Sequence, residues 1–297
     1  MSYYESYLTV IKFRLFLLKK KIYSILLPYR IIKISDNQHK FKKIIYLNSE
    51  KKVFKKYLNF FSRAKIYTKG YEVPEGFVSE LNTIKLHSDS GLLMTKGKII
   101  LESGMNLRRI LHMKNLLKKI LNFKFQKNTQ FKDKVCTSII HLPWAKESNF
   151  HWFIDCLSRI YLLKDYFKNE ITILVPKKIK KFQMETLKFC IPKNWNIFII
   201  EDNQVYQLDK YIFPSFLSTH LSGYLDFRVI EFMSNKIKEG YKIKKKMYKE
   251  NIFISRNKAN KRKILNENKL HDILRKYNFK IVFSEDLQYK EQVELFY

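Results

Sequence analysis

A chain of 297 residues exceeds the size at which a single hydrophobic core usually stops growing, which favours two domains. Hydrophobic residues make up 46% of the chain, while glycine (7) and proline (6) are scarce, and this composition excludes a disordered or low-complexity protein. The 58 Lys and Arg residues against 27 Asp and Glu residues give a net charge of +31, which suits nucleic acid, anionic lipid or phosphorylated substrates without choosing among them.

The first 70 residues are basic and rich in aromatic residues, and we expect a helical start followed by short strands such as Lys43–Leu47. Lys12, Arg14 and the lysines at 19–21 interrupt the apolar runs, well short of the ~20 apolar residues that a membrane-spanning helix needs. No small-residue cleavage site follows, which argues against a signal peptide. Two interpretations remain: a helix packed on the protein, or a basic helix resting on an anionic membrane surface.

Short β-rich pieces begin near residue 71. Two turn sequences, Asp89-Ser90-Gly91 and Lys96-Gly97, separate these pieces, which predicts a small antiparallel meander. The stretch 108–123 then carries apolar residues at helical spacing with Lys or Arg between them, and this pattern predicts a helix.

Strands and helices alternate along the rest of the chain. We expect strands at 135–142, 171–176, 196–200 and 210–214, and helices at 149–167, 180–190 and 225–238. After a charged linker that starts near Gly240, a second series follows, with strands at 251–256 and 279–286 and helices at 266–277 and 289–297. Repeated strand–helix–strand order implies right-handed crossovers and parallel sheets with helices on both faces.

The expected fold class is therefore α/β, with two Rossmann-like domains in tandem. A basic helical or mixed region spans 1–70, an α/β domain with the meander spans 71–240, and a partial Rossmann-like domain spans 241–297. The three cysteines, Cys136, Cys156 and Cys190, are widely spaced and form no CxxC pair, which argues against a disulfide framework or zinc site and fits the reducing cytoplasm.

Polar residues form one stripe on the predicted helix 149–167. At ~100° per residue, His151, Asp155 and Arg159 fall on one side of the helix, and Ser148 or Asn149 can cap its first turn. His151 and Asp155 are i and i+4 neighbours, so the carboxylate can orient the imidazole. Such a pair suits a general base, whose pKa has to lie near the working pH.

The alternative is a purely structural stripe, in which Asn149 and His151 cap the helix and Asp155 forms an ordinary ion pair with Arg159. The place of this helix in the chain favours chemistry. It begins shortly after a predicted strand, and open α/β sheets place their ligand sites just beyond the carboxyl ends of the strands.

A second group of polar residues follows the strand near residue 251. Arg256 comes directly after this strand, and Arg262, Asn266 and Glu267 lead into the next helix. Backbone N–H groups at a helix N-terminus, with arginines nearby, suit a diphosphate. A solvated basic turn is the alternative, although the planar guanidinium of arginine matches phosphate oxygens better than lysine does.

Several motifs in order resemble glycosyltransferase family 61, including its bacterial capsular-polysaccharide members. They are N-F-H-W-F-I-D-x-x-x-R-I-Y-L-L, I-L-V-P, F-Q-x-E-T-L, F-I-S-R-x-x-A-x-x-R-x-I-x-N-E and E-Q-V-E-L-F, and the resemblance runs from about Val73 to Tyr297. It implies a two-domain GT-B fold, a nucleotide-sugar donor held mainly by the C-terminal domain, a carbohydrate or lipid-linked acceptor held mainly by the N-terminal domain, and inversion at the anomeric carbon.

This resemblance implies roles for the two polar groups. The base is Asp155 or His151, and the substrate contacts are Asn149, Arg159, Arg256, Arg262, Asn266 and Glu267, with the two arginines near the second strand on the leaving diphosphate. The sequence contains no Asp-x-Asp motif, so we expect no metal and no other cofactor.

The chain departs from the family pattern at its end. Family members continue past E-Q-V-E-L-F into a Gly-rich loop resembling G-P-H-G-A-G-L-T-N, which is absent here, so we expect a truncated product or a separate polypeptide that supplies the rest. The alternatives are a non-catalytic accessory protein at the membrane surface and a basic nucleic-acid-binding protein. The second lacks a recognisable binding module, and we expect a cytoplasmic protein, with or without peripheral contact to the inner face of the cell membrane.

Overall fold

The computed structural model separates the chain into two compact units, Met1–Met233 and Ser234–Tyr297, and the boundary falls within one helix. It describes residues 31–34, 36, 42–47, 50–52, 71–111, 116, 119, 123, 128–139, 145, 148–218, 225–244, 250–259 and 263–297. The helical start expected before residue 31 and the proposed substrate contact Arg262 lie outside these residues.

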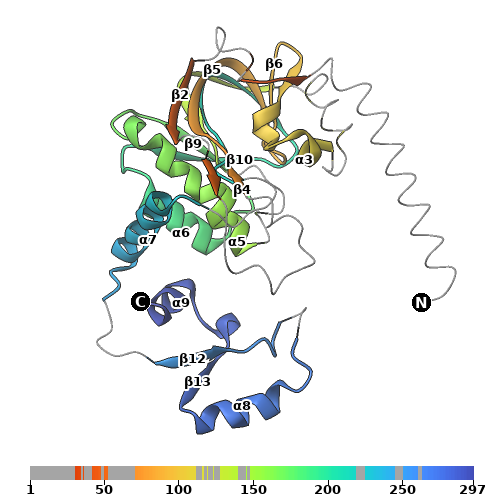
Figure 1. Cartoon of the computed structure of the whole chain (residues 1–297). Helices are drawn as coiled ribbons and strands as arrows, with labels where there is room; N and C mark the ends of the chain where they lie inside the picture. Colours follow the sequence, from red (N-terminus) through yellow and green to blue (C-terminus); the bar gives the residue numbers. More distant parts are fainter. Residues whose placement is uncertain are drawn as a thin grey trace, which may run out of the picture. The chain divides into compact units, whose positions relative to one another are not determined.

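In the described part of the first unit, nine strands form one mixed sheet (Figure 1). Their order is β1-β7-β6-β5-β11-β8-β9-β10, and β2 also pairs with β5. The strands are β1 (Ile31–Ile32), β2 (Lys42–Leu47), β5 (Gly76–His87), β6 (Leu93–Thr95), β7 (Lys98–Ile100), β8 (Asn128–Thr137), β9 (Thr172–Pro176), β10 (Asn196–Ile200) and β11 (Val205–Pro214). A separate antiparallel pair joins β3 (Glu50–Lys52) to β4 (Tyr71–Val73).

The antiparallel half of the sheet contains the predicted meander. β5, β6 and β7 pair antiparallel in sequence order, which confirms that prediction. Their turns use left-handed backbone at Gly91 (φ 65°), Lys96 (φ 46°) and Gly97 (φ 74°), a conformation that glycine adopts without steric cost. β2 confirms the short strand expected at 43–47 and pairs antiparallel with β5.

The parallel half consists of β11, β8, β9 and β10. From β8 the chain moves outward to β9 and β10, and it then returns to β11 on the other side of β8. The strand order therefore reverses between β8 and β11, and such a topological switch point is where open α/β sheets bind ligands.

Two expectations need correction. The sheet is mixed rather than parallel throughout, because β11 pairs antiparallel with β5 on its other side (Val205 opposite His87). β8 and β11 also begin earlier than expected, at Asn128 and Val205, because their first residues pair with each other, although Thr129 and Gln130 of β8 are exposed. Local hydrophobicity cannot show such a pairing.

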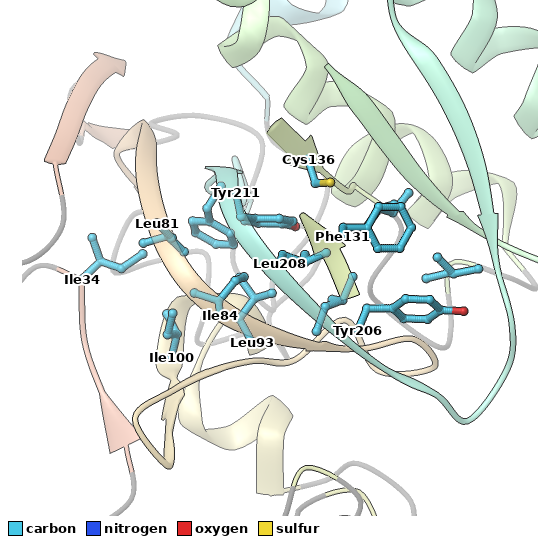
Figure 2. Close-up of a cluster of buried hydrophobic side chains, with 14 of the residues drawn as sticks. Ile34, Leu81, Ile84, Leu93, Ile100, Phe131, Cys136, Tyr206, Leu208 and Tyr211 are labelled. Atoms are coloured by element: carbon cyan, nitrogen blue, oxygen red, sulfur yellow. The ribbon is translucent and has the colours of Figure 1, made fainter. Parts of the chain in front are cut away.

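The core of the first unit lies on both faces of the sheet. Neighbouring residues of a strand point to opposite faces, so Leu93 and Ile100 join one buried cluster, and Met94 and Ile99 join another. Figure 2 shows the first cluster, in which side chains of β5 (Leu81, Ile84) and β11 (Tyr206, Leu208, Tyr211) pack together. The second cluster packs Ile110 of α3 (Leu107–Leu111), together with Leu116 and Phe123, against the meander.

The remaining helical segments of the first unit follow the strands. They are the 3-10 segment η4 (Leu101–Gly104), α5 (Asn149–His151), η6 (Trp152–Cys156), η7 (Leu157–Tyr166), α6 (Lys181–Cys190) and α7 (Phe227–Tyr241), which continues into the second unit. The positions of α6 and α7 confirm the helices expected at 180–190 and 225–238. No helix in the described residues is both long and apolar enough to cross a membrane.

The second unit contains a strand–helix–strand series. β12 (Asn251–Ile254) and β13 (Phe279–Val282) pair in parallel, with Asn251 opposite Phe279, and α8 (Glu267–Lys276) connects them. The short 3-10 segment η8 (Ser284–Asp286) leads into α9 (Tyr289–Leu295), and Figure 1 shows α8 and α9 on opposite sides of the strand pair. This confirms the second β-α-β-α series, while the GT-B arrangement of the two domains stays a prediction.

Candidate functional site

The first site lies at the switch point of the parallel strands. A helical segment follows β8 in the sequence, and residues 215–218 follow β11. Because β8 and β11 are parallel neighbours, their carboxyl ends meet at the same edge of the sheet. The two segments meet where the hydroxyl of Ser218 donates a hydrogen bond to Asp155 Oδ1, with an O–O distance of 2.6 Å.

The helical segment that carries the site changes type along its length. Ser148 caps α5, its Oγ accepting the N–H of His151 at 3.4 Å, which confirms one of the two predicted caps. η6 is a π-helix in which the N–H of Leu157 donates to the carbonyl of Trp152, and η7 continues as a 3-10 helix. π-helical turns are rare and concentrate at functional sites. Asp155 lies within this turn.

His151 and Asp155 form the predicted pair. His151 Nδ1 lies 2.7 Å from Asp155 Oδ2, while Ser218 occupies the other carboxylate oxygen. The Asp155 side chain is fully buried, at 0% exposure, and the His151 side chain is 26% exposed. A carboxylate accepts the Nδ1–H of a neutral imidazole, so Nε2 carries the lone pair. This geometry suits proton removal by His151.

Arg159 spans the same switch point from inside the protein. Its Nε donates to the carbonyl of Pro214 at 3.0 Å, its Nη2 donates to the same carbonyl, and its Nη1 donates to the carbonyl of Ile139 at 3.2 Å. The guanidinium lies 4.3 Å from the ring centre of Phe216 and 5.5 Å from that of Phe213. Burial lowers the pKa of Arg159 to about 10, so the group stays charged at neutral pH.

Arg159 is therefore a buried connection between the end of β11 and the chain beyond β8. The ion pair with Asp155 that the structural alternative assumed does not form among the described residues, because both Asp155 oxygens bond elsewhere. Asn149 is exposed as the first residue of α5, and Ser148 rather than Asn149 provides the cap.

The second group of residues lies at the end of β12. Ser255 and Arg256 follow this strand, and Glu267 is the first residue of α8. The backbone N–H of Arg256 donates to Glu267 Oε1 at 2.7 Å, and His271 Nε2 lies 3.6 Å from the same oxygen. Arg256 itself is exposed, and Asn266 precedes α8 as an exposed cap residue whose side chain makes no capping bond.

Residues 150–297, the C-terminal half of the chain, match the family model Glycosyltransferase 61. This match supports glycosyltransferase family 61 for residues 150–297. No curated protein matches the chain. The matched part contains His151, Asp155, Arg159 and the residues at the end of β12, and the match supports glycosyltransferase activity, which requires a donor and an acceptor.

Three successive backbone N–H groups at the end of β12 already donate hydrogen bonds within the protein. Ser255 donates to the carbonyl of Val282 at 2.8 Å, Arg256 donates to Glu267, and Asn257 donates to the hydroxyl of Ser255 at 3.2 Å. These three N–H groups each have an internal acceptor, while the backbone cradle expected for a diphosphate at the N-terminus of α8 stays a prediction. A diphosphate bound next to them would depend on side chains.

The electrostatics of Glu267 follow from its surroundings. Burial raises the pKa of Glu267, but hydrogen bonds from the Arg256 N–H and the Ser255 hydroxyl, together with His271, outweigh burial and hold the pKa below its usual range. Glu267 is therefore an anion inside the second unit at neutral pH.

Sequence reasoning missed three residues of these sites, Ser218, Ser255 and His271. Ser218 follows a predicted strand, but its approach to Asp155 depends on the strand order, which no local pattern reveals. The sequence could have predicted His271, because Glu267 and His271 have the same i, i+4 spacing as His151 and Asp155. Within the described residues, no group of three His, Cys, Asp or Glu side chains is placed to hold a metal ion.

Proposed function

We propose that the protein is an inverting glycosyltransferase that moves a sugar from a nucleotide-sugar donor to a hydroxyl group of a carbohydrate or lipid-linked acceptor. Capsular or other cell-surface polysaccharide synthesis on the cytoplasmic side of the membrane is the proposed setting. The observation that carries the proposal is the Ser218–Asp155–His151 network, whose three residues lie within the part of the chain that matches Glycosyltransferase 61.

His151 is the proposed base. Its Nε2 takes the proton of the acceptor hydroxyl as the acceptor oxygen forms a bond to the anomeric carbon. The bond from that carbon to the donor diphosphate breaks on the opposite side, and the nucleoside diphosphate leaves with the electron pair. One displacement of this kind inverts the anomeric centre.

Asp155 has a different role in this proposal. Sequence reasoning left the base open between His151 and Asp155, and the geometry favours His151 because Asp155 is fully buried with both oxygens engaged. Asp155 fixes the tautomer and orientation of the imidazole and stabilises the imidazolium that forms during transfer. Ser218 holds Asp155 from the far side of the switch point.

Arg159, expected to contact substrate, is proposed instead as a positioning residue. Its three N–H donors hold the carbonyls of Pro214 and Ile139, on either side of the switch point. This keeps the segment that carries Ser218 in reach of Asp155. Asn149, exposed next to the base, stays a proposed acceptor contact.

The donor diphosphate is proposed to bind Arg256 and Arg262, with Asn266 as a further contact. Guanidinium groups pair with phosphate oxygens in two parallel hydrogen bonds, which offsets the charge that develops on the leaving group. Because the sequence lacks an Asp-x-Asp motif, we propose that these arginines act without a bridging metal. The family match favours neither the membrane-accessory nor the nucleic-acid-binding alternative.

The test is transfer or hydrolysis by the full chain with a panel of UDP-, GDP- and CMP-sugars, with and without EDTA. We expect activity that EDTA leaves unchanged and that His151→Asn abolishes, with an inverted anomeric configuration by NMR. Retention of configuration would refute the single displacement. Salt-sensitive binding to random DNA without turnover of any sugar would favour the nucleic-acid-binding alternative.

A further inference from the structure

Each unit contains a buried carboxylate next to a histidine. In the first unit Ser218 and His151 bond Asp155, and in the second unit Glu267 accepts the N–H of Arg256, with His271 Nε2 3.6 Å away. Each histidine lies four residues from its carboxylate on a helical segment. The two pairs differ in exposure, because the His151 side chain is 26% exposed whereas the side chains of Glu267 and His271 are only 1% and 6% exposed.

We propose that Glu267 and His271 are positioning residues that hold the backbone of Arg256 at the end of β12, so that this arginine can bind the donor diphosphate. The inference rests on the proposed function for the role of Arg256. It also changes the role expected for Glu267, which was a direct substrate contact. A side chain as buried as Glu267, with one oxygen on a backbone N–H, acts through Arg256 instead.

Glu267 joins the start of α8 to the end of β12. Its Oε1 lies 2.7 Å from the N–H of Arg256, eleven residues earlier in the chain. Ser255, the residue before Arg256, donates its own N–H to the carbonyl of Val282 at the end of β13. The backbone at Arg256 is thus fixed from α8 and, through Ser255, from β13. A buried charged hydrogen bond of this kind is costly to break.

His271 supports Glu267 from the next turn of α8. Its ring packs against Phe253 of β12, with ring centres 5.8 Å apart, and against Phe283 just after β13, at 6.1 Å. Both contacts are edge-on, with interplanar angles of 70° and 89°. Two aromatic rings, one on β12 and one just after β13, therefore hold the imidazole, and its Nε2 lies 3.6 Å from Glu267 Oε1.

The proposal explains why this end of β12 has no spare backbone donor at 255–257. The N–H groups of these three residues are engaged in internal bonds that shape the loop. Binding of the diphosphate then depends on arginine side chains, and these are useful only where the backbone under them is held still.

Amide hydrogen exchange of the full chain tests the contact itself. We expect the Arg256 amide to be protected in the wild type, and we expect Glu267→Ala to raise its exchange rate about tenfold or more, since the amide loses its acceptor. Glu267→Gln should keep most of the protection, because an amide oxygen can accept the same bond. Asp272→Ala is the matched control, because Asp272 is an acidic residue of α8 whose side chain is 72% exposed. An unprotected Arg256 amide in the wild type overturns the proposal.

Titration with UDP, GDP and inorganic diphosphate tests the role. We expect Glu267→Ala and Arg256→Ala to weaken binding about tenfold each, His271→Ala to weaken it less, and Glu267→Gln to restore most of it. For Glu267→Ala, we expect the KM for the donor to rise by a larger factor than kcat falls, and we expect Glu267→Gln to reverse most of the change in KM. Loss of Arg256 protection in folded Glu267→Ala with unchanged diphosphate affinity overturns the positioning role.

A failure of the proposed function gives a different result. In that case the wild type binds no diphosphate. The Arg256 amide still exchanges faster in Glu267→Ala than in Asp272→Ala. This outcome refutes donor binding by Arg256, and with it the role proposed for the hydrogen bond from the Arg256 N–H to Glu267.

Discussion

Ser218 Oγ lies 2.6 Å from Asp155 Oδ1, and this hydrogen bond joins two segments that are 63 residues apart in the sequence. One segment follows β8 and the other follows β11, so the bond crosses the point where the strand order of the parallel sheet reverses. One oxygen of Asp155 thereby accepts a hydrogen bond from Ser218, and the other lies next to Nδ1 of His151.

Removing the hydroxyl of Ser218 should impair turnover more than binding. We expect Ser218→Ala to lower kcat about tenfold with little change in donor KM, because Asp155 loses one of its two hydrogen bonds and holds His151 less firmly. Ser218→Thr, which keeps the hydroxyl, should recover most of the rate. Ser234→Ala on the exposed face of α7 is the control. Equal kcat values for all three variants would contradict the network.

Asp155→Asn should be more damaging. An amide in place of the carboxylate can present its NH₂ group to Nδ1 and favour the wrong tautomer, so we expect kcat to fall about 10²–10⁴-fold while the chain stays folded. Single-turnover kinetics with a labelled donor measure the loss, and circular dichroism monitors the fold. A variant with full activity would exclude Asp155 from the orientation of His151.

Arg159 should matter for stability as well as activity. Arg159→Met removes the charge but leaves the carbonyls of Pro214 and Ile139 buried without a donor, and we expect a loss of about 2–4 kcal/mol in the free energy of unfolding. Arg159→Lys should lose less, since an ammonium group can still donate to one of the carbonyls. Urea denaturation measures both variants. Exposed Arg228→Met is the control for the loss of a positive charge.

Gly76 limits the packing next to Ser218. A Cβ at this first residue of β5 would lie 2.8 Å from Leu217 Cδ2, 3.0 Å from Leu47 Cβ and 3.1 Å from Leu162 Cδ2. Gly76→Ala should therefore destabilise the fold by about 1–3 kcal/mol and also lower activity, because Leu217 adjoins Ser218. A Cβ at Gly97 would have no atom within 4 Å, but the backbone there has φ +74°, which strains an alanine. Gly97→Ala should therefore lower stability without lowering activity. Thermal unfolding and the transfer assay separate the two variants.

His87 should make stability fall in mild acid. Burial, followed by the positive charge of Lys119, lowers the pKa of His87 to about 4 from its ordinary 6.5. The unfolded chain then binds a proton below pH 6.5 that the folded chain binds only near pH 4, so stability is lost as the pH falls through this window. At pH 5 the expected loss from this group is about 2 kcal/mol. Urea denaturation at pH 7 and pH 5 measures it, and His87→Gln should remove this part of the pH dependence.

Much of the second half of the chain was predictable because its signals are local. β9, α6 and β10 have the expected bounds within a residue or two, since each is a short apolar run or a helical pattern between turn residues. The His151–Asp155 contact was predictable for the same reason, because i, i+4 spacing brings side chains together on any helical segment. The early starts of β8 and β11 were not predictable, because they depend on the pairing of these two distant strands, and β8 begins with exposed polar residues.

The sequence by itself determined the order of the elements, the family of the C-terminal half and the histidine–carboxylate pair, because these depend on residues close together along the chain. Only the tertiary structure decided which of the candidate side chains are buried and which are exposed. Strand order brought Ser218 to Asp155, and packing buried Arg159 and Glu267 while leaving His151 and Arg256 accessible. These outcomes depend on contacts between distant segments, whose energies no local pattern encodes.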